Sequence, residues 1–387
     1  MHQASAAADT LDAMIAIVLS LLPAACALAS VTTWLVLRAS RRLGAFDSPP
    51  LPGQIKAAHR KVPNTGGIGI FVGVALPMLA GLLAVPIAPS LADTLPEALV
   101  PHLPGMHERL GMGAALLGSL ILLHVMGLVD DRRPLGPFVK LVVMAVPAVV
   151  LAWFFDTRLL TLLDAHVGGS WASILITVVW FVAVTNAFNF IDNMDGLAAG
   201  VAAVASACLL ATTLIGGQWF VAAVLALTLG ASLGFLVFNF PPARIFMGDS
   251  GSLVLGFLLA FLTVRATYLH DGSTTPPAHA VFTPVVILAV PLYDLVSVVI
   301  IRLSQGKSPF VGDLQHFSHR LVKRGLSRRA AVVVIWGFTL VIGISGIFLP
   351  SLQTWQAVLV GVQTALVLTV IAIFERASSA SANGGQP

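Results

Sequence analysis

Long apolar runs separated by short polar stretches dominate the sequence. A transmembrane helix needs about 20 consecutive apolar residues, and a window of that length finds eleven candidate spans. Only Gly216, Gly217 and Gln218 separate the sixth span from the seventh, so that division is the least distinct. The spans cover approximately 14–37, 67–88, 111–129, 138–155, 171–189, 196–216, 218–238, 251–269, 280–302, 330–349 and 355–374. This pattern predicts an all-α polytopic membrane protein.

The composition agrees with lipid as the solvent for most of the outer surface. The 387 residues are 57% hydrophobic and only 10% charged, whereas a soluble domain carries about 25% charged residues. We expect residues 1–376 to form a single transmembrane domain, followed by a disordered tail over the Ser-, Ala- and Gly-rich residues 377–387. Both cysteines, Cys26 and Cys208, lie in apolar runs, which indicates neither a disulfide framework nor a metal site.

The basic residues predict the orientation of the spans. The first apolar run is too long for the core of a signal peptide, and its positive flank follows it, which places the N-terminus outside. Eleven spans then place the C-terminus and the loops 38–66, 130–137, 239–250 and 303–329 inside. Of the 21 Lys and Arg residues, 18 fall inside, because only Arg109, Arg158 and Arg265 fall outside. The bias matches the positive-inside rule.

Several functional classes find no support in the sequence. It contains no Walker A motif, HExxH motif, Cys/His zinc spacing or nucleophile elbow. No basic strip alternates with aromatic residues, so a nucleic-acid partner is not expected. We expect His124 and Arg265, which stand alone in apolar surroundings, to pack against helices or to extend toward the membrane interface.

Four polar segments on the predicted inner side carry candidate chemistry, and the first follows the third span. Asp130 and Asp131 are adjacent there and precede Arg132 and Arg133. Two neighbouring carboxylates at a membrane face are costly unless they are solvated, paired or bound to a cation. The segment suits a cation site, although an ordinary solvated loop has the same composition.

The second segment lies at the end of the fifth span. Its polar side chains recur every three residues and share one face if the helix continues: Asn186, Asn189, Asp192 and Asp195. Amide and carboxylate oxygens suit a hard cation such as Mg²⁺. The plainer alternative is that Asp195 caps the sixth helix and that water satisfies the other side chains.

The third segment covers residues 239–252. Pro241 and Pro242 end the seventh helix, and Asp249 and Ser250 open the eighth. A helix N-terminus offers unpaired N–H groups to a phosphate, and Asp249 is suited to a metal that faces this phosphate. An ordinary Asp/Ser helix cap is the alternative.

The fourth segment is the long basic loop 306–321. Its residues His316, His319 and Arg320 could bind phosphate or sugar hydroxyls, although a solvated basic loop explains them equally well. Asp294, near the inner end of the ninth span, is expected to have a structural hydrogen-bonding role.

Taken in order, these segments resemble the polyprenyl-phosphate N-acetylhexosamine-1-phosphate transferases. That family includes peptidoglycan translocase I and the undecaprenyl-phosphate GlcNAc-1-phosphate transferases. The resemblance runs from about Asp47 to Arg329. It rests on Asp47-Ser48-Pro49, Lys56, His59, Pro63 and Gly66-Gly67, on GLVDD with Lys140, and on NAFNFIDNMDGLAAG, FNFPPARIFMGDSGS, PLYD and SPF…DLQHFSHRL.

The resemblance implies an activity, a cofactor and a location. Members transfer a sugar 1-phosphate from a UDP-N-acetylhexosamine to undecaprenyl phosphate and release UMP, in the synthesis of cell-envelope polysaccharides. It implies Mg²⁺ as the cofactor, with Mn²⁺ as an alternative, and a homodimer as a family-level expectation. It places a multi-pass catalytic domain in the inner membrane, with its active site on the cytoplasmic face.

The resemblance also implies roles for individual residues. Asp249 matches the principal Mg²⁺ ligand, and Asn189 matches a second metal or diphosphate contact. The uridine is expected near Phe246 and Asn239, and the loop that selects the sugar carries the two histidines. The residues implied in catalysis are Asp130, Asp131, Asp192 and Asp249. Those implied in substrate binding are His59, Lys140, Asn186, Asn189, Asp195, Asn239, Phe246, His316, His319 and Arg320.

Departures from the family pattern narrow the expectation. The family's Asp-Gly reads Asp192-Asn193 here, and its HxHH loop reads His316-Phe317-Ser318-His319. Because translocase I has consecutive histidines in that loop, GlcNAc 1-phosphate transfer fits better than transfer of phospho-MurNAc-pentapeptide. A transporter would place ionisable residues near the middle of the bilayer, whereas these spans are nearly free of acids. A membrane scaffold would explain the topology but not the ordered Asp and Asn residues.

Overall fold

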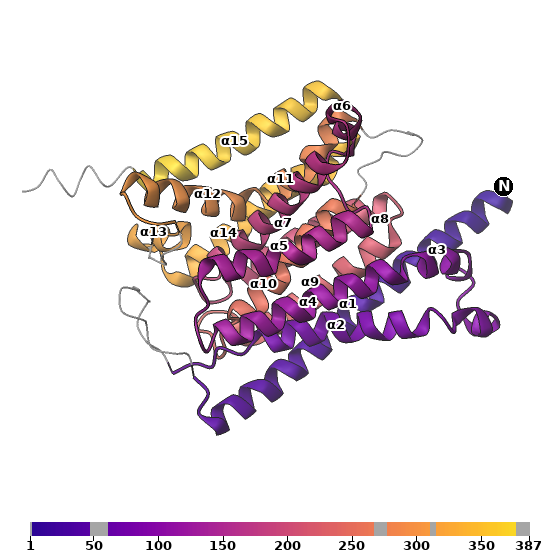
Figure 1. Cartoon of the computed structure of the whole chain (residues 1–387), viewed down its shortest axis with the longest axis horizontal. Helices are drawn as coiled ribbons and strands as arrows, with labels where there is room; N and C mark the ends of the chain where they lie inside the picture. The colour runs from indigo at the N-terminus through magenta and orange to yellow at the C-terminus, as the bar shows by residue number, and fades with distance from the viewer. Residues whose placement is uncertain (1, 47–60, 267–276, 310–314, 377–387) are drawn as a thin grey trace, which may run out of the picture.

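The computed structural model describes residues 2–46, 61–266, 277–309 and 315–376 (Figure 1). Within these ranges the chain forms helices and no strands. The long helices are α1 (His2–Leu43), α2 (Gly67–Ala84), α4 (Leu110–Asp130), α5 (Pro137–Phe154), α7 (Trp171–Ile191), α8 (Leu197–Ile215), α9 (Trp219–Asn239), α10 (Asp249–Arg265), α12 (Ala289–Ser304), α14 (Arg328–Phe348) and α15 (Thr354–Arg376). Shorter helices are η1 (Ala88–Thr94), η2 (Val100–His102), α3 (Leu103–Glu108), η3 (Thr161–Leu163), α6 (Asp164–Val167), η4 (Ala278–Phe282), α11 (Thr283–Ile287), α13 (Phe317–Lys323) and η5 (Leu349–Ser351).

Each predicted span corresponds to a helical segment. In the described ranges, nine helices are long and apolar enough to cross a membrane, or ten if the bent pair 278–287 and 289–304 forms one span. The remaining predicted span is α10, which has 17 residues. The turn at 216–218 separates α8 from α9, as predicted. The all-α polytopic membrane fold is therefore confirmed.

The predicted span 280–302 is sharply bent. Its two halves, the first ending with α11 and the second formed by α12, meet at an angle of 72°. Leu288 lies at the break, and Pro291 follows in the first turn of α12. Proline has no N–H to donate to the carbonyl four residues earlier, and its ring collides with that carbonyl. A continuous helix is therefore unfavourable at this point.

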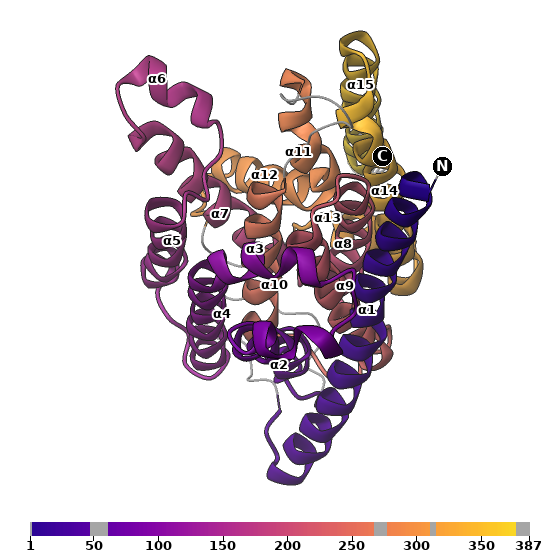
Figure 2. The same cartoon turned by 90° about the vertical axis from the view of Figure 1, so that its right-hand side faces the viewer.

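Helix α10 forms the centre of the bundle. Every residue from Ser250 to Thr263 is buried, and α2, α4, α7 and α8 pack around the helix (Figure 2). By contrast, α15 lies at the edge and exposes large apolar side chains such as Trp355, Val362 and Leu366. An exposed apolar face of this extent suits lipid and not water.

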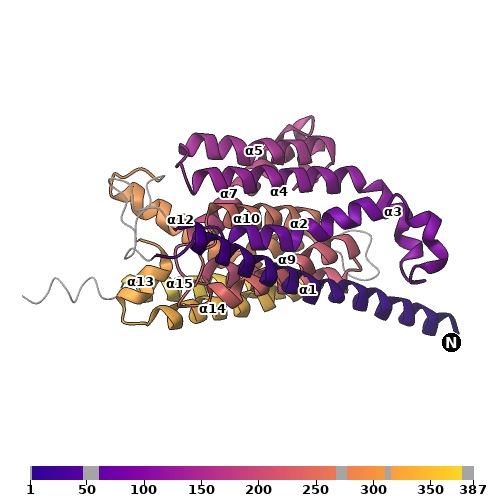
Figure 3. The same cartoon turned by 90° about the horizontal axis from the view of Figure 1, so that it is seen from below.

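The long helices run between two ends of the molecule. The C-terminus of α4 and the N-terminus of α10 meet at one end, which we call the acidic end and which also carries α13. The opposite end carries α3 and α6, and we call it the α3 end (Figures 1 and 3). Because α4 and α10 run in opposite directions, Arg109 and Arg265 both lie at the α3 end.

Candidate active site

Two glycines allow the end of α4 to lie directly against the start of α10. A Cβ on Gly127 would lie 2.4 Å from the backbone N and Cα of Ser250, so a side chain cannot fit there. Gly248 precedes α10 with a φ of +69°, and a Cβ on it would lie 2.5 Å from Oδ2 of Asp131. Both positions require glycine, which permits close backbone approach and a left-handed φ. They bring the carboxylates at the end of α4 to the first turn of α10.

The side chain of Asp131, which follows α4, accepts hydrogen bonds from the N-terminus of α10. Its Oδ1 accepts a hydrogen bond from the backbone N–H of Asp249 at 3.0 Å, and its Oδ2 accepts one from Ser250 at 3.4 Å. The side-chain amide of Asn64 donates to Oδ1 at 3.1 Å. The prediction that these N–H groups are open to a substrate phosphate is wrong, because the protein supplies its own anion there.

Burial and neighbouring charges perturb the acids of this region. The pKa of the Asp131 carboxyl is raised to about 7, chiefly by burial and then by the charge of Asp249, although the two backbone N–H groups oppose the shift. The pKa of Asp192 is raised well above its usual value, again by burial first and then by Asp249 and Asp131. The site therefore holds more negative charge than its own cations neutralise.

Lys140 and Asn189 bind the remaining oxygens of these acids. The ammonium of Lys140, on α5, lies 2.7 Å from Oδ2 of Asp130 and 2.7 Å from Oδ2 of Asp249. The amide of Asn189, on α7, donates to Oδ1 of Asp249 at 2.9 Å. Side chains from α4, α5, α7 and α10 thus converge. We call Asp130, Asp131, Lys140, Asn189 and Asp249 the acidic cluster.

The acidic cluster suits one kind of metal binding and not another. In the part of the chain that the structure describes, no three His, Cys, Asp or Glu side chains are arranged to hold a metal by themselves. Mg²⁺, however, is usually held by one or two carboxylates together with substrate phosphates and water. Asp249 and Asn189 supply oxygen-bearing side chains of the required type, and the uncompensated negative charge favours a divalent cation.

The predicted polar face of the fifth span does not continue beyond α7. This helix ends at Ile191, and Gly196, with a φ of +75°, precedes α8 without any side-chain cap. Oδ2 of Asp195 accepts a hydrogen bond from the backbone N–H of Ala243 at 2.9 Å. α7 therefore ends before Asp192 and Asp195 can extend its face, and the residue at the N-cap of α8 is Gly196 and not Asp195.

Asn186 lies one turn deeper in α7 than Asn189. Its side-chain amide donates to the carbonyl of Val182 at 2.8 Å and to Sδ of Met144 at 3.4 Å. These hydrogen bonds satisfy Asn186 within α7 and against α5. They do not join it to the acidic cluster.

Asn239 supports the segment between α9 and α10. This buried side chain accepts a hydrogen bond from the N–H of Gly196 at 2.8 Å and donates to the carbonyl of Ile245 at 2.8 Å. The neighbouring Phe246 is half-buried, and its backbone N–H donates to the carbonyl of Pro63 at 2.8 Å. Asn239 thus holds the segment that presents Phe246.

Asp294 holds the start of the histidine segment. Its carboxylate is buried and accepts hydrogen bonds from Nδ1 of His316 at 2.9 Å and from the backbone N–H of Phe317 at 2.7 Å. The ring of His316 also contacts Phe190 of α7 edge-on, with centroids 5.8 Å apart. The hydrogen-bonding role expected for Asp294 is confirmed, and it orients His316 toward the end of α7.

The other two residues of this segment have different surroundings. The ring of His319 lies 6.4 Å from that of His316 between centroids. The pKa of His319 is lowered to about 4, by burial first and then by the nearby His316 and Arg328. Arg320 points toward α15, where its Nε lies 3.1 Å from Oε2 of Glu375. It thus binds α13 to α15 and is not joined to the acidic cluster.

Sequence reasoning missed several contacts of the site. Asn64 was not singled out, although it lies between Pro63 and the Gly66-Gly67 pair that carried part of the resemblance. Ser318 was noted only as a departure from the family pattern, yet its hydroxyl donates to the side chain of Asn193 and joins α13 to the end of α7. His59 lies outside the described residues.

His124 lies behind the cluster and has the packing role expected of it. It stacks on Phe71 with ring centroids 4.2 Å apart, and its Nδ1 lies 2.9 Å from the carbonyl oxygen of Ser250.

Comparison with known proteins identifies relatives over most of the chain. The model of the glycosyl transferase family 4 matches residues 113–267, which include the cluster residues of α4, α5, α7 and α10. The chain is 31% identical to a probable undecaprenyl-phosphate N-acetylglucosaminyl 1-phosphate transferase of Bacillus subtilis (strain 168), over 85% of this chain and 84% of that protein. It is 31% identical to a decaprenyl-phosphate N-acetylglucosaminephosphotransferase of Mycolicibacterium smegmatis, over 89% of this chain and 86% of that protein. It is 26% identical to the undecaprenyl-phosphate alpha-N-acetylglucosaminyl 1-phosphate transferase of Escherichia coli (strain K12), over 77% of this chain and 74% of that protein.

Proposed function

This chain belongs to the glycosyl transferase family 4, and from that premise we propose that it transfers N-acetylglucosamine 1-phosphate from UDP-N-acetylglucosamine to undecaprenyl phosphate. The products are undecaprenyl-diphospho-N-acetylglucosamine and UMP. One observation carries the proposal: two carboxylates of α4, Lys140, Asn189 and Asp249 meet at one end of the helix bundle. The names of the relatives give the sugar and the polyprenyl acceptor.

The reaction is a single displacement at phosphorus. An oxygen of the lipid phosphate bonds to the β-phosphorus of the nucleotide sugar, and the bond from that phosphorus to the bridging oxygen of UMP breaks. A phosphate monoester has a second pKa near about 6, so the lipid nucleophile is already largely ionised at neutral pH. An obligatory side-chain base is unnecessary, and the residues act mainly by positioning and by charge.

Each member of the acidic cluster then has a distinct task. Asp130 holds the ammonium of Lys140, which faces the phosphates and offsets their charge. Asp131 fixes the first turn of α10 and thereby the position of Asp249. Asp249 and Asn189 are the residues that would hold Mg²⁺, for which Mn²⁺ is the alternative. The metal, when bound, neutralises charge on the diphosphate.

The substrates are placed around this cluster. We place the uridine beside Phe246 and Asp192, and the sugar near His316 and His319, which α13 brings to the end of α7. We place the acidic end on the cytoplasmic side of the inner membrane, with the N-terminus outside and the C-terminus inside. The sequence pattern, which assigns 18 of the 21 Lys and Arg residues to that side, supports this orientation.

The proposal is tested with purified full-length protein, undecaprenyl phosphate, Mg²⁺ and a panel of UDP-sugars. We expect UMP release with UDP-N-acetylglucosamine and not with UDP-MurNAc-pentapeptide. Asp249→Ala should lower turnover by about a hundredfold or more, because it removes a group that stabilises transferring charge. Asp93→Ala, an exposed acid of η1 at the α3 end, is the matched control and should turn over normally.

Two results would contradict the proposal. Unaltered UMP release by Asp249→Ala would reject the metal assignment. Preference for the muramyl donor would move the chain to the translocase I branch. A transporter is not favoured, because the acids that the structure brings together gather at one end of the helices and not at mid-membrane.

A further inference from the structure

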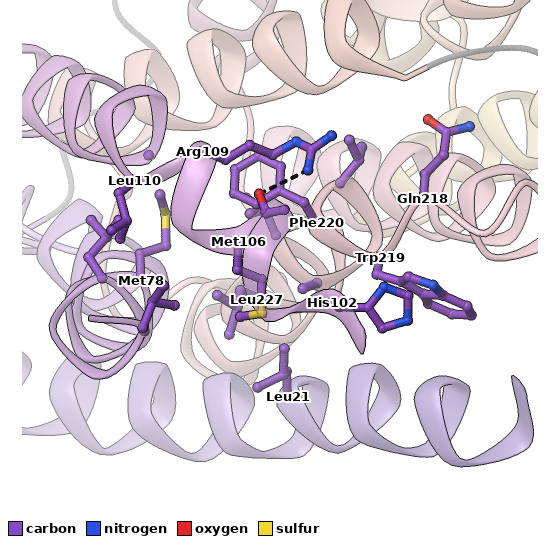
Figure 4. Close-up of a pocket in the computed structure, with 18 of the residues that line it drawn as sticks. Leu21, Met78, His102, Met106, Arg109, Leu110, Gln218, Trp219, Phe220 and Leu227 are labelled. Carbon is purple, nitrogen blue, oxygen red and sulfur yellow. Dashed lines mark hydrogen bonds between the residues drawn. The ribbon is translucent and has the colours of Figure 1, made fainter. Parts of the chain in front are cut away.

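A cavity of about 660 Å³ lies at the α3 end, far from the acidic cluster (Figure 4). It is bounded by residues of α1, α2, α4, α9 and α10 together with η2 and α3. Most of its wall is apolar, with Met78, Met106 and Leu227 among the contributing side chains (Figure 4). The 17 residues of α10 separate the cavity from Asp249, a distance of about 25 Å at 1.5 Å per residue. The cavity is therefore not part of the proposed active site.

Two arginines give this apolar cavity a positive charge. Arg109, at the start of α4, and Arg265, at the end of α10, both line it. The guanidinium of Arg109 donates a hydrogen bond to the carbonyl of Gly105, one turn earlier, at 3.0 Å. Nε of Arg265 is buried and has no hydrogen-bond partner among the described residues. No carboxylate lines the cavity within the described ranges.

The third arginine of the α3 end, Arg158, is paired with two carboxylates. Its Nη2 lies 2.5 Å from Oδ1 of Asp156, and its Nη1 pairs with Asp164. Within the described ranges neither Arg109 nor Arg265 forms an ion pair with a carboxylate, and the charge of Arg109 repels that of Arg265 more strongly than Asp156 attracts it. Arg109 is exposed, whereas the half-buried Arg265 has a buried Nε without a partner among the described residues. Such a guanidinium is costly in apolar surroundings and usually marks a binding function. Arg265 is therefore the side chain of this cavity that an anion would satisfy.

The position of the cavity indicates an amphiphile. His102 and Trp219 meet edge-on beside it, with ring centroids 6.2 Å apart (Figure 4). Tryptophan is enriched where the hydrocarbon meets the head groups. A free inorganic anion would leave the apolar wall uncovered, and an uncharged lipid would leave both guanidinium groups unpaired. Arginine forms paired hydrogen bonds with phosphate.

We propose that this cavity binds an anionic lipid through its phosphate, in the leaflet opposite to the acidic cluster. Arg109 and Arg265 bind the phosphate, and the acyl or prenyl chain lies along the wall formed by α2, α4 and α9. The inference is independent of the proposed transferase activity, because it uses neither the acidic cluster nor its substrates.

Native mass spectrometry of the delipidated full-length protein tests the proposal. The probes are phosphatidylglycerol, undecaprenyl phosphate, phosphatidylcholine and inorganic phosphate. The variants are Arg109→Gln, Arg265→Gln and the double variant, and Arg158→Gln is the control that removes the same charge from the same end. We expect phosphatidylglycerol to bind the wild type and the control. The double variant should bind it about thirtyfold more weakly, because it loses two basic residues that each contribute about 1 kcal/mol to binding of an anionic lipid.

The comparison of probes identifies the source of the phosphate. Binding of phosphatidylglycerol that the double variant loses supports a general anionic-lipid site. If phosphatidylglycerol does not bind, and undecaprenyl phosphate loses one of two bound copies in the double variant, the polyprenyl carrier is the ligand. Equal binding of phosphatidylcholine, or lipid binding unchanged by both substitutions, would overturn the proposal. Arg109→Gln, at an exposed position, provides the same test if the double variant does not fold.

Discussion

The charged side chains at the two ends of α10 differ in how many partners the chain provides for them. At the acidic end, Asp249 contacts Lys140 and Asn189 through its side chain, and Asp131 receives its backbone N–H. At the α3 end, Arg265 leaves Nε without a partner and borders an apolar cavity. The first arrangement is closely packed, and side chains or backbone groups of the chain contact both carboxylates. The second joins positive charge to an apolar wall, which is the basis of the proposed lipid site.

This difference separates two ways of building a site within a membrane. A site for phosphoryl transfer must hold its groups in fixed positions, so the acidic end uses glycine contacts and reciprocal hydrogen bonds. A lipid site needs room and a charge, and the α3 end provides both with little internal order. Substitutions at the acidic end should therefore change turnover, whereas those at the α3 end should change lipid binding.

The largest effect is expected from Gly248→Ala. The added Cβ would lie 2.5 Å from Oδ2 of Asp131, so Asp131 must move away from the first turn of α10. A displacement of about 1 Å costs about a hundredfold in rate, and UMP release should fall by that factor. Gly44→Ala is the matched control, because Gly44 has a similar φ of +66° and no atom near its Cβ position. A similar loss in both variants would show that backbone strain, and not the cluster, causes the effect.

A second large effect is expected from Lys140→Gln. The ammonium bridges Asp130 and Asp249 at 2.7 Å each, and its removal leaves the carboxylates to repel each other. We expect turnover to fall about ten- to a hundredfold, within the range for groups that stabilise transferring charge. Lys307→Gln, an exposed lysine of the same loop region as α13, is the control. Equal rates for both variants would remove Lys140 from the site.

A smaller effect is expected from Asp294→Asn, which acts through His316. The carboxylate accepts two hydrogen bonds, from His316 and from the backbone of Phe317, and an amide can accept only from one side. We expect KM for the UDP-sugar to rise about tenfold with a lesser change in kcat, as for a lost buried hydrogen bond.

A double-mutant cycle with His316→Gln checks this positioning role. If Asp294 acts through His316, adding Asp294→Asn to His316→Gln should raise KM little further. Fully additive effects would instead indicate that Asp294 acts independently.

The smallest effect concerns the dependence of stability on pH. The folded protein lowers the pKa of His319 to about 4 from the ordinary value of 6.5. Between these values the unfolded chain binds a proton that the folded protein does not, so stability falls as pH falls from 6.5 toward 4. His319→Gln should therefore reduce the drop in Tm between pH 7 and pH 5. Identical pH profiles of Tm for both proteins would show that His319 is not held neutral.

The sequence predicted the helices well and the contacts between them poorly. Apolar runs specify spans directly, because lipid demands long apolar segments. The bend at Leu288 was missed, since Pro291 lies inside an otherwise continuous apolar run. The three-residue spacing of Asn186 to Asp195 suggested one helical face, but α7 ends at Ile191, before Asp192 and Asp195.

The acidic residues were predicted as candidates, while their partners were not. Asp131 and Asp249 are 118 positions apart, and the close approaches at Gly127 and Gly248 bring them together. Asn64 belongs to a third segment. Such tertiary contacts leave no periodic signal in one sequence, so neither the capping of α10 by Asp131 nor the bridge made by Lys140 could be derived from it.

The hydrogen bonds from α10 to Asp131 have a consequence for how inactive variants are interpreted. The carboxylate of Asp131 belongs to the proposed active site and also binds the first turn of α10, the central helix of the bundle. Replacing it therefore tests two properties at once, chemistry and mechanical anchoring. An inactive Asp131→Ala variant shows a catalytic role for the acid only if amide hydrogen exchange along α10 remains as slow as in the wild type.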